Sequence, residues 1–350
     1  MFFSASRFLR LMAMIGASVL IGAVSGAASA ENVTVGIIGS STDAPIFIAD
    51  ANGYFKDEGL TVKLVQFNSG AKMVPVLGTG DLDAGAGAAS VGLYNASERG
   101  IEIKIVADKV QYGTTYNHSS LLVRKDLVAS GKFKGFKDLK GLKVAITAHG
   151  STDESVLNEA LKLGGLKWGD AEPVYLGFGQ HLPAFENGAI DASLTAEPLV
   201  TRILKAGSAV QFVSNDKIYP RQQSAVLLYG ARFIKDRPDI AKKFMRAYIR
   251  GARFYNDAVA NATLSGPRGQ EVIAILTKYS NLKDPNVFKV ITAFSVDPDG
   301  KLNVNSLRKD WQFFKDTGRI DGKVGVDAVV DTSFAERALA ELGPYKRATR

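Results

Sequence analysis

The sequence predicts an α/β fold in which mostly parallel sheets are flanked by helices. Short runs of apolar and β-branched residues alternate with segments of helical periodicity, which is typical of parallel strands joined by crossover helices. Hydrophobic residues make up 46% of the chain, enough for a packed core. No low-complexity tract separates the parts, so we expect two lobes with the chain crossing between them.

The first 30 residues have the three parts of an export signal. Arg7 and Arg10 give a positive start, residues 11–24 are apolar, and Ala28-Ser29-Ala30 gives a small-residue cleavage site. The apolar stretch is shorter than the roughly 20 residues that a membrane span needs. We therefore expect cleavage after Ala30 and a periplasmic location. Because the chain has no cysteine, we expect neither a lipoprotein, nor a disulfide framework, nor cysteine-ligated zinc.

The N-terminal third repeats a unit of strand, small polar turn and helix. Val33–Ile38 is a strand-like run, and Pro45 stands where a first helical turn tolerates proline. Asn52-Gly53 is a helix stop signal. Further strands are expected at 61–66, 83–86 and 101–107, with helices after Ser69-Gly70 and at 91–98.

The middle of the chain continues this alternation. Ser151 and Glu154 have the spacing of a capping box, which predicts a helix directly after Ser151. Glu197-Pro198 is expected to begin another helix. Strands are expected at 120–124, 142–147, 174–176, 190–194, 211–213 and 225–229.

The C-terminal third is mostly helical. Pro238 is expected to open a long amphipathic helix, and a second helix is expected at 270–279. Asn305 is the expected N-cap of a third, and Thr332 or Ser333 of the last.

Charge and histidine spacing argue against two classes of function. The formal net charge is +8, but Lys and Arg are scattered, so we expect no nucleic-acid partner. The three histidines, His118, His149 and His181, lack the spacing of a helical metal motif. We expect no metal site and no cofactor.

Four short segments together resemble a known family. They are Asn52–Leu60, Leu77–Asp83, Asp138–Val144, and Asn187–Asp191 with Glu197-Pro198. In order and spacing they resemble the periplasmic substrate-binding proteins of nitrate/sulfonate/taurine-type ABC importers. The binders of thiamine pyrimidine precursors belong to the same superfamily.

The resemblance implies a two-lobed clamshell of the periplasmic-binding-protein type (type II-like). Lobe one would combine residues 31–117 with 220–350, and lobe two would be the inserted block 118–219. A small-molecule ligand would sit in the cleft between the lobes. The closed form, a monomer, would then dock on an ABC permease in the inner membrane.

Candidate ligand-binding residues stand where strand ends meet helix starts, or where the chain crosses between lobes. Ligands bind outside the carboxyl ends of parallel strands, and helix N-termini favour anions. For the serines and threonines, helix capping is the competing interpretation. Arg221 is a candidate partner for a carboxylate or sulfonate. The candidates are Ser40, Ser41, Thr42, Asp43, Ser69, Gly70, Ala89, Ser90, Tyr116, His118, Gly150, Ser151, Thr152, Asp153, Glu197 and Arg221.

Two carboxylates among these candidates bear on the ligand. Asp43 and Asp153 would repel a simple anion, which favours a zwitterion or a polar organic molecule over nitrate. We therefore expect a non-catalytic binder of a small organic anion or zwitterion: a sulfonate, a taurine-like compound or a carboxylate.

Three alternatives stay open. One is a binder of a thiamine pyrimidine precursor or another heteroaromatic compound. The second is an enzyme on the same fold, although the pyrimidine-precursor synthases carry a cysteine-rich segment that this chain lacks. The third is a binding protein that serves a sensor; an ATPase and a permease encoded beside it would favour transport.

Overall fold

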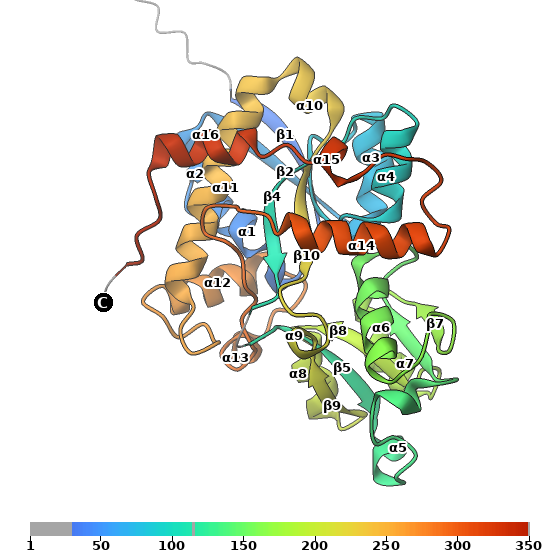
Figure 1. The fold of residues 1–350 in the computed structure, drawn as a ribbon. Helices are drawn as coiled ribbons and strands as arrows, with labels where there is room; N and C mark the ends of the chain where they lie inside the picture. The colour runs from blue at the N-terminus through green and yellow to red at the C-terminus, as the bar shows by residue number, and fades with distance from the viewer. Residues whose placement is uncertain (1–29, 114–115, 349–350) are drawn as a thin grey trace, which may run out of the picture.

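The computed structural model describes residues 30–113 and 116–348, which form two five-stranded sheets flanked by helices (Figure 1). The predicted α/β fold is confirmed. The predicted export signal lies outside the described residues, apart from Ala30. The strands are β1 (Glu31–Ile37), β2 (Leu60–Gln66), β3 (Ala84–Gly87), β4 (Lys104–Gln111), β5 (Ser119–Arg124), β6 (Lys143–Ile146), β7 (Glu172–Tyr175), β8 (Ala192–Ala196), β9 (Ala209–Ser214) and β10 (Gln223–Tyr229).

The two sheets have the same plan. Their strand orders are β2-β1-β3-β10-β4 and β7-β6-β8-β5-β9. In each sheet four strands run in one direction, and the strand in the fourth place, β10 or β5, is antiparallel to both neighbours. That reversed strand is the first strand after the chain crosses from the other sheet. It enters at the edge where the parallel strands end, so it has to run the opposite way.

We call the part that carries the first sheet lobe one and the part that carries the second lobe two. The chain passes from lobe one to lobe two between the end of β4 and the start of β5, and it returns in residues 215–222. The boundaries predicted at 117/118 and 219/220 fall in these segments and stay predictions.

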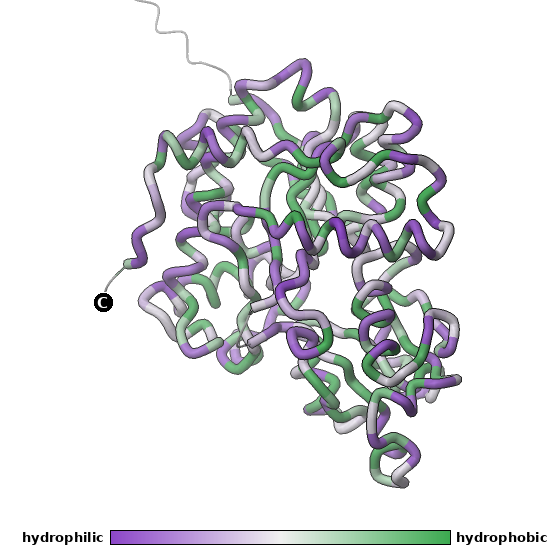
Figure 2. The backbone as a smooth tube through the Cα atoms, viewed as in Figure 1, coloured by the Kyte–Doolittle hydropathy of each residue, from purple (hydrophilic) through white to green (hydrophobic). Residues whose placement is uncertain are grey.

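The helices cover both sheets (Figure 1). Figure 2 shows mainly hydrophobic residues along the central strands and mixed character along the helices, as expected when each helix buries one face. The helices are α1 (Ala44–Ala51), α2 (Tyr54–Asp57), α3 (Met73–Thr79), α4 (Val91–Glu98), α5 (Lys125–Ala129), α6 (Thr152–Leu163), α7 (His181–Glu186), α8 (Leu199–Ala206), α9 (Asn215–Ile218), α10 (Ala231–Asp236), α11 (Pro238–Ala258), α12 (Gly269–Tyr279), α13 (Pro285–Phe288), α14 (Val304–Asp316), α15 (Val326–Val329) and α16 (Ser333–Leu342).

One predicted capping box is absent, and one predicted helix cap is misplaced. Ser151 is the N-cap of α6, but its side chain makes no capping hydrogen bond, so the predicted capping box with Glu154 is absent. Glu154 instead pairs with Arg319 and accepts a hydrogen bond from the Tyr175 hydroxyl. Because these partners hold the Glu154 carboxylate, it does not accept a hydrogen bond from the backbone N–H of Ser151.

The second correction concerns α14. The predicted cap Asn305 lies inside the helix, and Asn303 is the N-cap, with its side chain accepting a hydrogen bond from the Ser306 N–H. Asn303 also donates from Nδ2 to the carbonyl oxygen of Arg221, 2.6 Å away, and so ties α14 to the crossing segment.

We expect Asn303→Ala to lower the free energy of unfolding by at least about 1 kcal/mol, since it removes a helix cap and the hydrogen bond to the Arg221 carbonyl oxygen. Asn305→Ala is the matched control, because Asn305 is exposed in the first turn of the same helix. Its effect should stay within about 0.5 kcal/mol. Urea denaturation of both variants measures the difference, and equal losses would show that the cap is not at Asn303.

Within the described ranges, no helix has both the length and the apolar character to cross a membrane.

Candidate functional site

A cavity lies between the two lobes, where the parallel strands of both sheets end. Its inner chamber has a volume of about 90 Å³. Residues at or after the carboxyl ends of β1, β2, β3, β4, β6 and β8 line it, and so do residues around the beginnings of the reversed strands β5 and β10. This is the place where open parallel sheets bind ligands.

An outer chamber of about 280 Å³ adjoins the inner one and shares Ile38, Ser40, Phe178, Pro198 and Leu199 with it. Arg202, on α8, is exposed beside it and lines its wall. The two chambers form one cleft with an inner and an outer part.

The fold brings nine of the predicted site residues to the inner chamber. These are Ser40, Thr42, Ser69, Gly70, His118, Ser151, Thr152, Asp153 and Glu197. Their contact with a ligand stays a prediction.

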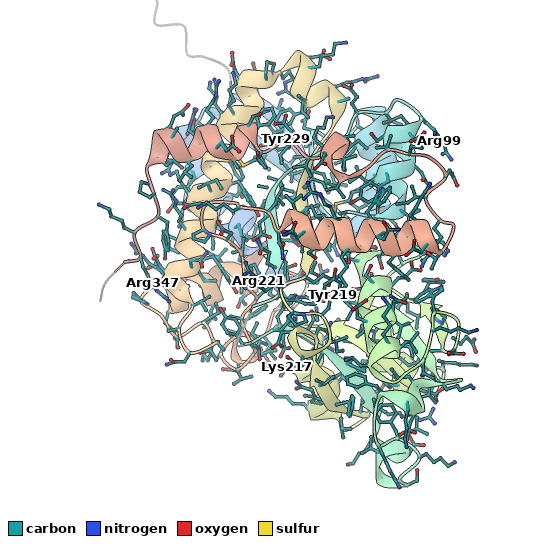
Figure 3. All side chains as sticks on the ribbon, in the orientation of Figure 1. Arg99, Lys217, Tyr219, Arg221, Tyr229 and Arg347 are labelled. Carbon is teal, nitrogen blue, oxygen red and sulfur yellow. The ribbon has the colours of Figure 1, made fainter. Side chains whose placement is uncertain are left out.

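The other seven predicted residues lie outside its walls: Ser41, Asp43, Ala89, Ser90, Tyr116, Gly150 and Arg221. Two of these, Ser41 and Gly150, make contacts between the lobes. Arg221 is exposed on the crossing segment, where Figure 3 places it beside Tyr219 at the junction of the lobes.

Asp43 is neutralised by a lysine. Its Oδ1 lies 2.9 Å from Nζ of Lys109 on β4, and both side chains are almost fully buried. Its Oδ2 accepts hydrogen bonds from the N–H groups of Ile38, Gly39 and Ser40. Asp43 therefore shapes the loop after β1 and holds Lys109 in place, and it adds no net charge to the cleft.

Two further carboxylates line the inner chamber. Asp153, in the first turn of α6, accepts hydrogen bonds at Oδ2 from the N–H and the hydroxyl of Thr147. Glu197 accepts from the N–H and the hydroxyl of Thr201 in α8. Burial raises the pKa of both carboxyl groups, and these hydrogen bonds oppose the shift.

His118 is a neutral group in the wall. Burial, helped by the charge of Lys109, lowers its pKa to about 3. Its Nε2 lies 3.2 Å from the hydroxyl oxygen of Ser119, and its buried Nδ1 has no hydrogen-bond partner among the described residues. The ring packs edge-on against Tyr112 and Phe294.

Hydrogen bonds join the lobes on several sides of the cavity. The Ser41 hydroxyl donates to the Glu197 carbonyl oxygen, 3.2 Å away. The Val91 N–H, at the start of α4, donates to the Gly150 carbonyl oxygen, 3.0 Å away. Thr152 donates from Oγ1 to the Ser224 carbonyl oxygen. The structure is therefore a closed form, with direct contacts between the lobes around the chamber.

A second set of contacts between the lobes runs along α6 and α14, which Figure 1 shows side by side. Lys309 on α14 pairs with Glu159 on α6 at 2.7 Å. Arg319, just after α14, pairs with Glu154 and lies over the ring of Trp168. These contacts brace the first turn of α6, which carries Thr152 and Asp153 to the chamber.

Thirteen of the 22 residues that line the inner chamber were not predicted, among them Lys109, Thr147 and Phe178. For Lys109 a signal exists, because a lysine near the end of a buried strand needs a buried partner. Phe178 follows β7 in a glycine-rich turn, which marks a loop but does not place it in a cleft.

The fold and the position of the cavity define the class: this is the two-lobed fold of the periplasmic binding proteins. Its likeness to the periplasmic aliphatic sulphonate binding protein SsuA of Escherichia coli has a TM-score of 0.65 at 18% identity, covering 87% of this chain and 99% of the other. The chain belongs to the NMT1-like family, whose sequence profile matches residues 26–265. The predicted family resemblance is confirmed.

Sequence relatives include both binding proteins and enzymes. The taurine-binding periplasmic protein of Escherichia coli is 28% identical over 229 residues, 65% of this chain and 68% of the relative. A 4-amino-5-hydroxymethyl-2-methylpyrimidine phosphate synthase of Aspergillus parasiticus is 28% identical over 223 residues, 60% of this chain and 62% of the relative. Family membership alone therefore does not separate binding from catalysis.

Proposed function

We propose that this protein is the solute-binding component of an ABC importer. It captures a small organic anion or zwitterion (a sulfonate, a taurine-like compound or a carboxylate) between its lobes and delivers it to a permease in the inner membrane. It works in the periplasm as a monomer and has no nucleic-acid partner. The observation that carries the proposal is a small cavity walled by both lobes.

The mechanism is a population shift between open and closed forms. A ligand in the inner chamber contacts both lobes only when they are closed, so it stabilises closure by its differential affinity for the two forms. The contacts of Ser41 with Glu197 and of Val91 with Gly150 form in that state. The closed surface is what the permease recognises.

Catalysis is the second candidate, since a pyrimidine phosphate synthase is among the relatives. A serine–histidine contact in the chamber, Ser119 with His118, supports it poorly. A general base works best with a pKa near the operating pH, whereas burial holds that of His118 at about 3. We therefore infer binding without turnover.

Thermal-shift measurements followed by small-angle scattering test the proposal. The probes are taurine, ethanesulfonate, propionate and 4-amino-5-hydroxymethyl-2-methylpyrimidine. We expect at least one to raise the melting temperature, because a ligand bound only to the native form stabilises it by mass action. The same probe should reduce the radius of gyration. Binding without any reduction would contradict closure, and consumption of a probe by the purified protein would contradict the non-enzymatic role.

A further inference from the structure

The inner chamber carries an uneven distribution of charge. Three charged side chains line it in the described part of the chain: Lys109, Asp153 and Glu197. The charge of Lys109 is cancelled by Asp43, which lies behind it. What remains are the carboxyl groups of Asp153 and Glu197, so the chamber has no spare cation to balance an incoming anion.

Lys109 nevertheless keeps one donor for a ligand. Of its three N–H groups, one faces Asp43 at 2.9 Å and one donates to the Thr42 hydroxyl at 3.2 Å. The third has no partner among the described residues, and Lys109 is one of the residues that line the chamber from lobe one. It can meet an acceptor oxygen of a ligand, but as part of a neutral pair it attracts an anion only weakly.

Asp153 lines the same chamber from lobe two. Both of its described hydrogen bonds, from Thr147, go to Oδ2, and no Lys, Arg or His of the described ranges lies within ion-pair distance. Oδ1 has no described donor. Glu197 differs, since its two oxygens are taken by the N–H and hydroxyl of Thr201. Asp153 is thus the carboxylate whose Oδ1 is available to accept a hydrogen bond from a ligand.

A simple oxyanion fits this chamber badly. Two unit charges 4 Å apart interact by about 4 kcal/mol at an effective dielectric constant of 20, so a lone anion near Asp153 would be repelled. A nitrogen that carries hydrogen would instead donate to Asp153, and charge-assisted hydrogen bonds of this kind are strong.

We propose that the ligand carries an N–H-bearing nitrogen, as a protonated amine or an amino-heterocycle, that donates to Asp153 while an acceptor oxygen of the same molecule meets Lys109. This inference rests on the proposed function and narrows its ligand class. The two ends of the ligand then bind opposite lobes, which couples recognition to closure. Simple sulfonates, carboxylates and nitrate are poor ligands.

Matched pairs of probes test the inference by calorimetry on the purified chain from Glu31. The pairs are taurine with ethanesulfonate, β-alanine with propionate, and 4-amino-5-hydroxymethyl-2-methylpyrimidine with its analogue lacking the 4-amino group. Within at least one pair, the member with the nitrogen should bind at least about tenfold tighter, as expected when a buried acceptor loses its donor. The pair that responds separates an aliphatic amine from an amino-heterocycle.

Asp153→Asn supplies a second, independent readout. It keeps the size of the side chain and removes its charge, so affinity for the nitrogen-bearing member should fall about 100-fold. Affinity for the nitrogen-free member of the same pair should rise, because the negative charge at residue 153 no longer repels it. A merely structural defect would weaken both. Glu186→Gln, an exposed carboxylate on α7 of the same lobe, is the matched control and should change neither.

Three outcomes would overturn the inference. The first is equal or tighter binding of the nitrogen-free member in every pair, and the second is an Asp153→Asn variant with unchanged preference. Either would leave the proposed function standing, since a ligand would still close the lobes. The third, no binding of any probe, would also overturn it. The wild-type comparison needs no variant, so poor folding of Asp153→Asn cannot obscure the result.

Discussion

Replacing Lys109 by methionine should lower the free energy of unfolding by about 3–5 kcal/mol. The ammonium group is 1% exposed and its partner Asp43 is fully buried. Without the lysine, the Asp43 carboxylate stays buried with no opposite charge, and removing one member of a buried pair costs far more than removing both. Urea denaturation at neutral pH measures the loss.

The control for this prediction is a double-mutant cycle. Asp43→Asn combined with Lys109→Met removes both charges and keeps an oxygen to accept from the loop N–H groups. It should lose less stability than Lys109→Met alone, which would show coupling between the sites. Lys132→Met, at an exposed lysine in lobe two, should stay within about 0.5 kcal/mol. A loss below about 1 kcal/mol for Lys109→Met would contradict the importance of the pair.

Replacing Gly150 by alanine should weaken ligand binding about 5- to 150-fold. Gly150 lies in lobe two, and an added Cβ would stand 2.8 Å from Cβ of Val91 in lobe one. Such a clash costs about 1–3 kcal/mol, and it arises only when the lobes are closed. A ligand that closes the lobes has to overcome this clash. The cost of about 1–3 kcal/mol therefore raises the dissociation constant by about 5- to 150-fold.

Gly165→Ala separates the clash from backbone strain. Gly150 and Gly165 both have φ of +70°, so alanine strains each backbone alike by roughly 1–2 kcal/mol. Gly165 has no atom within 4 Å of the added carbon. Both variants should lose similar stability without ligand, and only Gly150→Ala should lose affinity for whichever probe binds best. Equal affinities in calorimetry would show that the Gly150 loop does not approach Val91 on closure.

The regular part of the fold could be predicted from the sequence because it is specified locally. Each of the ten strands in the described part of the chain overlaps a predicted run, since apolar runs bounded by turn residues carry their own signal. Helix α4 was predicted with the bounds that it has, Val91–Glu98. The helices with little sequence signal, such as α2 and α5, are one turn long and depend on their tertiary surroundings.

The chemistry of the site could be predicted only in part, because it depends on pairs far apart in the chain. The sequence marks Asp43 as a carboxylate in the cleft, but nothing near it points to Lys109 on a distant strand. The error at Glu154 has the same cause: its spacing from Ser151 suits a capping box, while Arg319 and Tyr175 are the partners it finds. Local sequence patterns specify helices and strands. Contacts between residues far apart in the chain decide which charged side chains remain available to a ligand.

The place of β10 between β3 and β4 has a consequence for the order of folding. All strands of lobe two have been synthesised once residue 214 is added, whereas the sheet of lobe one lacks an inner strand until residue 229 follows. Until then β3 and β4 have no partner between them and expose their backbone edges. Lobe two can therefore complete its sheet first. Lobe one still exposes unpaired strand edges at that stage, and such edges favour chaperone binding.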